Sequence, residues 1–161
     1  MKRIYAIGVI VLCIGSLICS CNSSPADDSG LPGLRVTYNG QRYVADSVNA
    51  HRVNSSIVID AYTGGQKRFE MDLQGQTVAT YDLGSINSVY VFDNSKTYNT
   101  NGWCNGGTVK ITKFTDAANR INNSKYTDST TYINGNFGFG AHAGTDSVLF
   151  NSGYFNLVPI R

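Results

Sequence analysis

Hydrophobic and polar residues alternate with a period of two along most of the chain after Leu34. In the stretch LRVTYNGQRYVA, the side chains of Leu34, Val36 and Tyr38 fall on one face of a strand. Asn39-Gly40 is the dipeptide typical of a two-residue type I′ turn. Such a turn places Val36 opposite Tyr43, so the apolar faces of both strands coincide. The pattern predicts a β-hairpin.

A second hairpin is predicted in SSIVIDAYTGGQKRFEMDL. A two-residue loop at Gly64-Gly65 would place the apolar Ile59 opposite Glu70. A three-residue loop over 64–66 instead places Ile59 opposite Met71, so both apolar faces meet. Because a shift of one residue moves every side chain to the other face, face parity favours the three-residue loop.

The remaining alternating segments predict further short strands separated by Gly and Asn clusters. They span residues 77–82, 88–93, 108–114, 132–141, 146–151 and 154–158. Only Thr115–Asn123 could form a helical turn, and its asparagines disfavour a longer helix. We therefore expect an all-β fold, an antiparallel β-sandwich or partly closed barrel, as a single domain over residues 34–161.

The first twenty residues have the organisation of an export signal. Lys2 and Arg3 precede an apolar run from Ile4 to Ile18, which is shorter than the roughly 20 residues needed to span a bilayer. Ile18-Cys19-Ser20-Cys21 fits a bacterial lipobox, which requires a small residue directly before the acylated cysteine. We therefore predict a lipoprotein signal peptide over residues 1–20 and lipidation of Cys21. Plain secretion is the alternative.

Cleavage before Cys21 changes the composition of the mature chain. Of 161 residues, 141 remain, and the basic residues fall from 13 to 11, equal to the 11 acidic ones. A formally neutral chain without a Lys/Arg cluster is a poor candidate for nucleic-acid binding. Residues 21–33 are rich in Ser, Pro, Gly and Asp and predict a flexible tether. Cys104 is the one remaining unmodified thiol, so an internal disulfide framework is excluded.

Several segments resemble a known group of proteins. The lipobox leader is followed by VTYNGQRYVA, KRFEMDL, SVYVFDNSKTYNTN, GGTVKITKF, YINGNFGFGA and SVLFNSGYFNLV. This order resembles uncharacterised Bacteroidetes lipoproteins, a family built on a domain of unknown function, over nearly the whole mature chain. Asn136 departs from the Thr or Ser that is commoner there, and the insertion 119–131 is longer. The resemblance implies a β fold and an envelope location, and it transfers no catalytic residue.

The same resemblance bears on location and modification. It implies an outer-membrane lipoprotein, displayed on the cell surface or facing the periplasm, with the lipid anchor as its membrane contact. Asp27-Asp28 behind Cys21 is either solubilising charge or a sorting signal for surface export. The tripeptides at 46–48, 128–130 and 146–148 match the short O-glycosylation pattern of that lineage, a pattern that also arises by chance.

Side chains that could perform chemistry are scattered. His51 and His142 have no neighbouring ligand at metal-binding spacing, so we expect no metal and no cofactor. Glu70 and Asp72 share a strand face, but the acid and nucleophile of a glycosidase must flank a substrate rather than lie on one strand. With Arg68 they are expected to form the solvated side of that strand. Cys104 lacks a catalytic histidine nearby and is expected to be structural.

Two features suggest a recognition surface instead. Trp103, the only tryptophan, lies in a Gly-Asn loop, where it either closes one end of the core or offers a stacking platform for a sugar or peptide. In YINGNFGFGAH the apolar Ile133, Phe137 and Phe139 alternate with a polar or glycine face. That face forms either a close contact with a neighbouring element or a shallow groove for a glycan or peptide, and its residues are Asn134, Asn136, Gly138, Gly140 and His142.

These observations favour one class of function. We expect a lipid-anchored, noncatalytic β domain of the cell envelope that binds an extracellular glycan or peptide. Two alternatives stay open: a structural or assembly subunit of an envelope complex with a protein partner, and a hydrolase whose site is assembled from loops.

Overall fold

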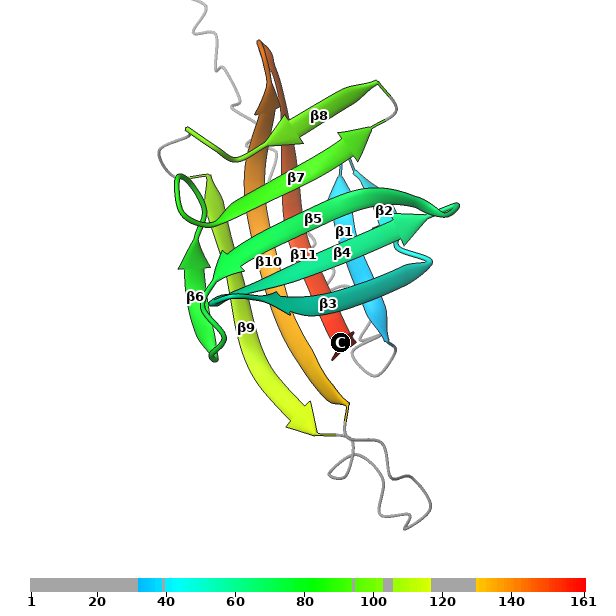
Figure 1. Ribbon diagram of the computed structural model, residues 1–161. Coiled ribbons are helices and arrows are strands. Elements are labelled where there is room, and N and C mark those ends of the chain that lie inside the picture. The colour runs from blue at the N-terminus through cyan, green and yellow to red at the C-terminus, as the bar shows by residue number, and fades with distance from the viewer. Residues whose placement is uncertain (1–31, 39, 94, 103–105, 117–129) are drawn as a thin grey trace, which may run out of the picture.

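The computed structural model describes residues 32–38, 40–93, 95–102, 106–116 and 130–161 (Figure 1). These described residues form eleven strands and no helix. The strands are β1 (Gly33–Tyr38), β2 (Gln41–Val44), β3 (Ser47–Val53), β4 (Ser56–Thr63), β5 (Gln66–Gln74), β6 (Ala79–Asp82), β7 (Ser88–Asp93), β8 (Lys96–Asn99), β9 (Gly107–Asp116), β10 (Thr131–Ala143) and β11 (Asp146–Ile160). The predicted all-β, single-domain fold is confirmed.

One hydrogen-bonded sheet contains all eleven strands, in the order β2-β1-β11-β3-β4-β5-β7-β8-β10-β9-β6. An additional pairing of β10 with β11 joins distant members of this order and partly closes the sheet on itself. Figure 1 shows β3, β4, β5, β7 and β8 crossing in front of β1, β9, β10 and β11 at a steep angle. We call these two groups the front and back layers, and β2 and β6 complete the back layer.

The layers are joined at two corners. At one corner Ile160 at the end of β11 pairs with Ala50 of β3, and this pairing is parallel. At the other corner His142 near the end of β10 pairs with Asn99 of β8. The sheet is mixed because the β11–β3 pairing is parallel while the other strand pairings are antiparallel. Because the long strands β10 and β11 belong to the back layer but reach the front layer at their ends, the sheet has the form of a partly closed barrel.

The first hairpin has the predicted register. Tyr38 pairs with Gln41 and Val36 pairs with Tyr43. Beyond the last ladder pair, the backbone N–H of Ala45 donates to Leu34 O at 3.0 Å, which extends the contact in the same register. Asn39 of the turn lies outside the described residues.

The second hairpin has the predicted pairing in its body but a different turn. Ile59 pairs with Met71, as face parity requires, yet Thr63 pairs with Gln66, so the loop contains only Gly64 and Gly65. Both glycines have positive φ angles, 58° and 75°, which suit the two-residue turn whose twist matches paired strands. The predicted three-residue loop is therefore wrong.

A β-bulge supplies the odd residue that this hairpin needs. Ala61 pairs with Phe69, while the adjacent Tyr62 pairs with Lys67, so Arg68 is the extra residue of β5. A bulge restores parity as well as a longer loop does, and it also redirects the bulged side chain. Arg68 consequently leaves the regular outward row in which the sequence pattern placed it with Glu70.

The C-terminal segment forms one strand rather than the two predicted. β11 runs through the predicted break, but its register against β10 shifts twice, each time by an extra residue in β11. The two irregular stretches contain Ser152 and Leu157, which have φ angles of 53° and 52°. Bulges increase twist and bend a strand, which allows β11 to follow the barrel from one layer to the other. The expected break at 152–153 is thus a bulge.

Two strands were missed from the sequence. β3 carries the alternation in Val48 and Ala50, which are buried, but these two side chains are small and most of its other residues are polar. β8 is only four residues long, with Tyr98 as its buried residue. The predicted helical turn falls mostly on residues 117–123, outside the described residues, and Thr115 belongs to β9.

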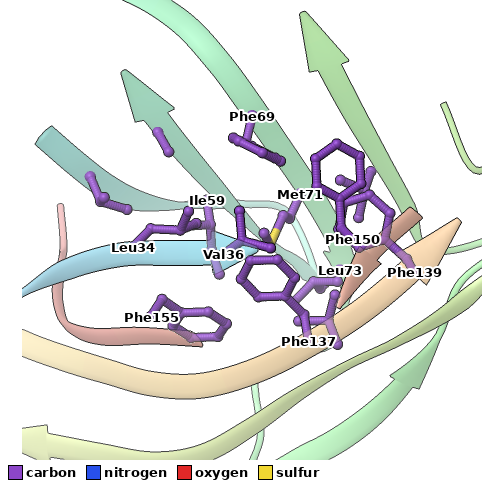
Figure 2. Close-up of a cluster of buried hydrophobic side chains, with 14 of the residues drawn as sticks. Leu34, Val36, Ile59, Phe69, Met71, Leu73, Phe137, Phe139, Phe150 and Phe155 are labelled. Carbon is purple, nitrogen blue, oxygen red and sulfur yellow. The ribbon is translucent and has the colours of Figure 1, made fainter. Parts of the chain in front are cut away.

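Side chains from both layers fill a common apolar core. Figure 2 shows rings from β10 and β11 pointing into the same interior as aliphatic side chains from β1, β4 and β5. Full burial of one Val, Leu, Ile, Met or Phe side chain stabilises the fold by roughly 1.5–3 kcal/mol relative to exposure. The core residues labelled in Figure 2 are Leu34, Val36, Ile59, Phe69, Met71, Leu73, Phe137, Phe139, Phe150 and Phe155.

Glycines make room for two of these rings. Gly135 pairs with Phe155 and Gly153 pairs with Phe137 across the β10–β11 ladder. A Cβ atom on Gly135 would lie 2.2 Å from Phe155 Cζ, and one on Gly153 would lie 2.2 Å from Phe137 Cε2. Each ring therefore lies over the glycine opposite it, so any larger residue at these positions would displace core side chains.

Candidate functional site

A cavity of about 270 Å³ lies where several hairpins of the partly closed barrel turn. We call it the aromatic pocket. Its lining residues come from the turn-proximal ends of seven strands and are mostly apolar: Tyr38, Tyr43, Thr63, Arg68, Phe69, Val91, Phe92, Asp93, Tyr98, Val148 and Phe150. A mouth of a β-barrel is a common location for a ligand site. The volume is just below the ~300–1,000 Å³ of sites for drug-sized ligands.

Four aromatic rings in contact form one wall of the aromatic pocket. Tyr38 stacks on Phe150 with ring centroids 4.9 Å apart, and Phe150 meets Phe69 edge-on at 5.4 Å. Phe69 in turn contacts Tyr43 at 5.1 Å. These rings come from β1, β11, β5 and β2, so the wall depends on the closure of the barrel. Figure 2 shows Phe69 and Phe150 within the core cluster, so the pocket extends directly from the core.

The aromatic pocket has few polar groups, and two of its hydroxyls bond to each other. The hydroxyls of Tyr43 and Thr63 lie 2.5 Å apart and share a hydrogen bond. Burial raises the pKa of the Tyr43 hydroxyl above its ordinary value, an effect partly opposed by this hydrogen bond and by the positive charge of Arg68. Arg68 Nη1 donates to Phe92 O at 3.3 Å. Asp93 is exposed, so the pocket reaches solvent on its side.

Local backbone contacts hold the hairpin turn beside the aromatic pocket. The carboxylate of Asp46 accepts the backbone N–H of Gly64 at 2.7 Å, which joins the β2–β3 corner to the β4–β5 turn. A carboxylate accepting a backbone N–H is among the stronger hydrogen bonds of a protein. This contact fixes Thr63 at the rim of the pocket.

The predicted recognition face of β10 lies on the outside of the back layer. The side chains of Ile133, Phe137 and Phe139 are buried, and those of the alternate residues are partly or fully exposed, as the alternation predicts. The five described residues of the predicted site, Asn134, Asn136, Gly138, Gly140 and His142, therefore share one face. The aromatic pocket is lined by other residues. Trp103, Cys104 and Cys21 lie outside the described residues.

Two members of that face have different surroundings. Asn134 Oδ1 accepts the backbone N–H of Leu157 at 2.7 Å, so this side chain stabilises the β11 bulge. A Cβ atom on Gly138 would meet only Phe150 O at 3.7 Å, an ordinary contact. At the inward Gly135, by contrast, a Cβ atom would clash with Phe155 and with Lys110 O. Asn136 is exposed and pairs with Lys110 and Tyr154 on its two sides.

The carboxylates of the front layer form a charge cluster. Lys67 Nζ lies 2.8 Å from both Asp60 Oδ1 and Glu70 Oε2, and His51 Nδ1 lies 3.7 Å from Asp60 Oδ2. Asp60 is only 6% exposed although its side chain faces outward. Among the described residues no group of three or more potential ligands is arranged to hold a metal ion. Glu70 lies on the outer face, as expected, with Lys67 rather than Arg68 beside it.

A second, shallower depression of about 770 Å³ follows the loops around β6. It is lined by residues of the segment 74–87 and by Gly102. Apart from Gly102, its walls come from one stretch of chain, whereas those of the aromatic pocket converge from seven strands, so the aromatic pocket is the better-defined candidate site.

Sequence reasoning missed the aromatic pocket. Apart from Tyr98, the tyrosines and phenylalanines that line it were recognised as strand residues, but their meeting depends on pairings between distant segments such as β1 with β11. One signal was available: face parity required one odd residue between Ala61 and Phe69, and Arg68 lies in that segment directly beside Phe69.

The comparisons with known proteins give a family and nothing closer. Residues 31–159 match DUF6252, a domain of unknown function, and the chain therefore belongs to this family. No curated protein and no solved structure matches the chain. Among the described residues there is no helix of the length and apolarity needed to cross a membrane.

Proposed function

We propose that this member of the DUF6252 family is a lipid-anchored, noncatalytic binding domain of the cell envelope. Its aromatic pocket receives an apolar or aromatic side chain of an extracellular peptide. The observation that carries this proposal is the set of converging rings around a cavity of about 270 Å³ that reaches solvent beside Asp93. A cavity of this size suits one side chain rather than a whole folded partner.

The chemistry of the walls favours a peptide side chain over a sugar. A sugar carries hydroxyls on most of its carbons, and burying them without partners costs free energy. In the aromatic pocket the hydroxyls of Tyr43 and Thr63 already bond to each other. An apolar side chain requires no such partners and gains contact with the rings of Tyr38 and Phe150.

A pocket-filling substitution tests this proposal. Val148 lines the aromatic pocket, whereas the adjacent Leu149 is 59% exposed on the other face of β11. We expect a library of short apolar peptides to raise the melting temperature of the wild-type domain and of Leu149→Trp, but not of Val148→Trp. Equal stabilisation of both variants, or stabilisation only by soluble glycans, would contradict the peptide assignment.

The location part of the proposal rests on the lipobox before Cys21 and requires its own experiment. We expect the mature protein to begin at Cys21, to carry acyl chains by mass spectrometry and to fractionate with membranes. Cys21→Ser is expected to abolish acylation and release the protein. A native chain that retains Met1, or one without acyl mass, would refute the anchor while leaving the peptide proposal intact.

A further inference from the structure

Arg68 is the one positively charged residue lining the aromatic pocket among the described residues. As the extra residue of a bulge it has no partner in the β4–β5 register. Its neighbours face opposite sides: Lys67 joins the outer charge cluster, and Phe69 is buried in the core. Bulges often redirect a side chain at functional sites. Here the bulge brings a guanidinium group to the rim of an otherwise apolar cavity.

The guanidinium group retains binding capacity. It donates one hydrogen bond, from Nη1 to Phe92 O at the long distance of 3.3 Å. A guanidinium carries five N–H donors in a planar fork that matches a carboxylate. Within the part of the chain that the structure describes, Arg68 forms no ion pair with a carboxylate. An incoming anion would therefore not have to displace an internal partner.

The other charge of the pocket is weaker in effect. Asp93 is exposed, and it pairs in register with Lys96 across the β7–β8 hairpin. Its field therefore acts through solvent, which screens it, whereas Arg68 is half-buried. The positive charge of Arg68 also acts on Tyr43 across the pocket, where it lowers the pKa of the hydroxyl against the effect of burial. The cavity thus favours an anion beside its apolar walls.

We infer that the aromatic pocket selects an apolar group that carries a carboxylate, namely the C-terminal residue of a peptide, with Arg68 contacting the terminal carboxylate. This inference rests on the proposed peptide-binding function and names its substrate class. The rings of Tyr38, Phe69 and Phe150 hold the side chain, and Arg68 distinguishes a free C-terminus from an internal residue, whose carbonyl carries no charge.

Two matched probes test the inference. N-acetyl-phenylalanine and N-acetyl-phenylalaninamide differ only in the charge of the terminal group. We expect the acid to bind the wild-type domain roughly tenfold or more tightly than the amide in calorimetric titrations, the range of one charge-assisted hydrogen bond. Arg68→Gln is expected to remove this difference between acid and amide. Arg52→Gln, at an exposed position of β3, is the control and is expected to preserve it.

A salt titration provides a reading on the unmodified domain. Raising the salt concentration is expected to weaken binding of the acid but not of the amide. Equal affinity for acid and amide would overturn the inference and leave the proposed function standing. Tighter binding of phenethylamine, lost in Asp93→Asn, would also overturn it, because Asp93 would then select a cation. Failure of all three probes would reject the proposed function together with the inference.

Discussion

The contact between Gly135 and Phe155 gives the sharpest test of the packing. A Cβ atom on Gly135 would lie 2.2 Å from Phe155 Cζ and 2.3 Å from Lys110 O, whereas unstrained carbon contacts are roughly 3.5–4.0 Å. Phe155 is only 1% exposed, so its ring is enclosed by the core and cannot move out into solvent. Gly135→Ala therefore forces both a core ring and a neighbouring strand to shift.

The cost can be estimated from the behaviour of overpacked cores. Inserting a methyl group into a well-packed site destabilises a protein by about 1–3 kcal/mol. For a domain of this size we expect the melting temperature to fall by roughly 5–15 °C. Gly138→Ala is the matched control, because its added Cβ would meet only Phe150 O at 3.7 Å on the other face of β10. Removing a glycine from a strand there is expected to be neutral or slightly stabilising.

Thermal unfolding followed by circular dichroism measures both variants. A double-mutant cycle with Phe155→Ala identifies the contact itself, because the smaller side chain removes the clash and the two substitutions then cost less together than the sum of their separate effects. Phe155→Ala alone is expected to cost about 3–5 kcal/mol through the cavity it leaves. A Gly135→Ala variant that melts with the wild type, or a Gly138→Ala variant that loses as much, would refute the proposed packing.

Two other contacts make predictions of stability. Asn134→Ala removes the acceptor of the Leu157 N–H and is expected to lower the free energy of unfolding in urea by about 1–3 kcal/mol. Asn136→Ala, on the same face, is the control and is expected to change the unfolding midpoint little. Equal effects of the two substitutions would contradict a stabilising role for the Asn134–Leu157 hydrogen bond. Burial lowers the pKa of Lys67, but its contacts with Asp60 and with a second carboxylate outweigh burial and raise the pKa above its ordinary 10.5. The stability from this charge is therefore fully present below pH 10.5 and lost as the pH rises through the raised value. At pH 8, Lys67→Met is expected to lower the free energy of unfolding in urea by about 1–3 kcal/mol. The variant is also expected to lose the decline in stability that the wild type shows toward higher pH. A decline that is unchanged in the variant would refute the role of this ammonium group.

The alternation of side chains is enough to predict the elements whose signal is local. The hairpin at Asn39-Gly40 followed from a turn dipeptide flanked by two apolar faces, and its register is confirmed. The pairing of Ile59 with Met71 followed from the need to bury both faces. The all-β class followed from many short alternating segments, and it too is confirmed. In each case the information lies within about twenty residues, where burial and turn geometry decide the pairing.

Other features depend on contacts between distant segments. Sequence parity required one odd residue in the second hairpin, but both a longer loop and a bulge at Arg68 satisfy parity, and only the packed structure distinguishes them. The placement of the predicted β10 face on the outside of the back layer agrees with the alternation, whereas the existence of a pocket elsewhere could not be inferred from it. The binding roles assigned to Trp103 and to this face remain predictions.

The sequence by itself determined most of the strands, though not β3 and β8, and which faces of the predicted strands are buried, because alternation and turn chemistry act over short distances. The tertiary structure decided how β10 and β11 close the sheet and which rings converge at its mouth. Closure depends on pairings between residues more than a hundred positions apart, such as Ala50 with Ile160, whose register no local pattern encodes. The aromatic pocket is a product of that closure, since its walls come from segments that meet only once the barrel has formed.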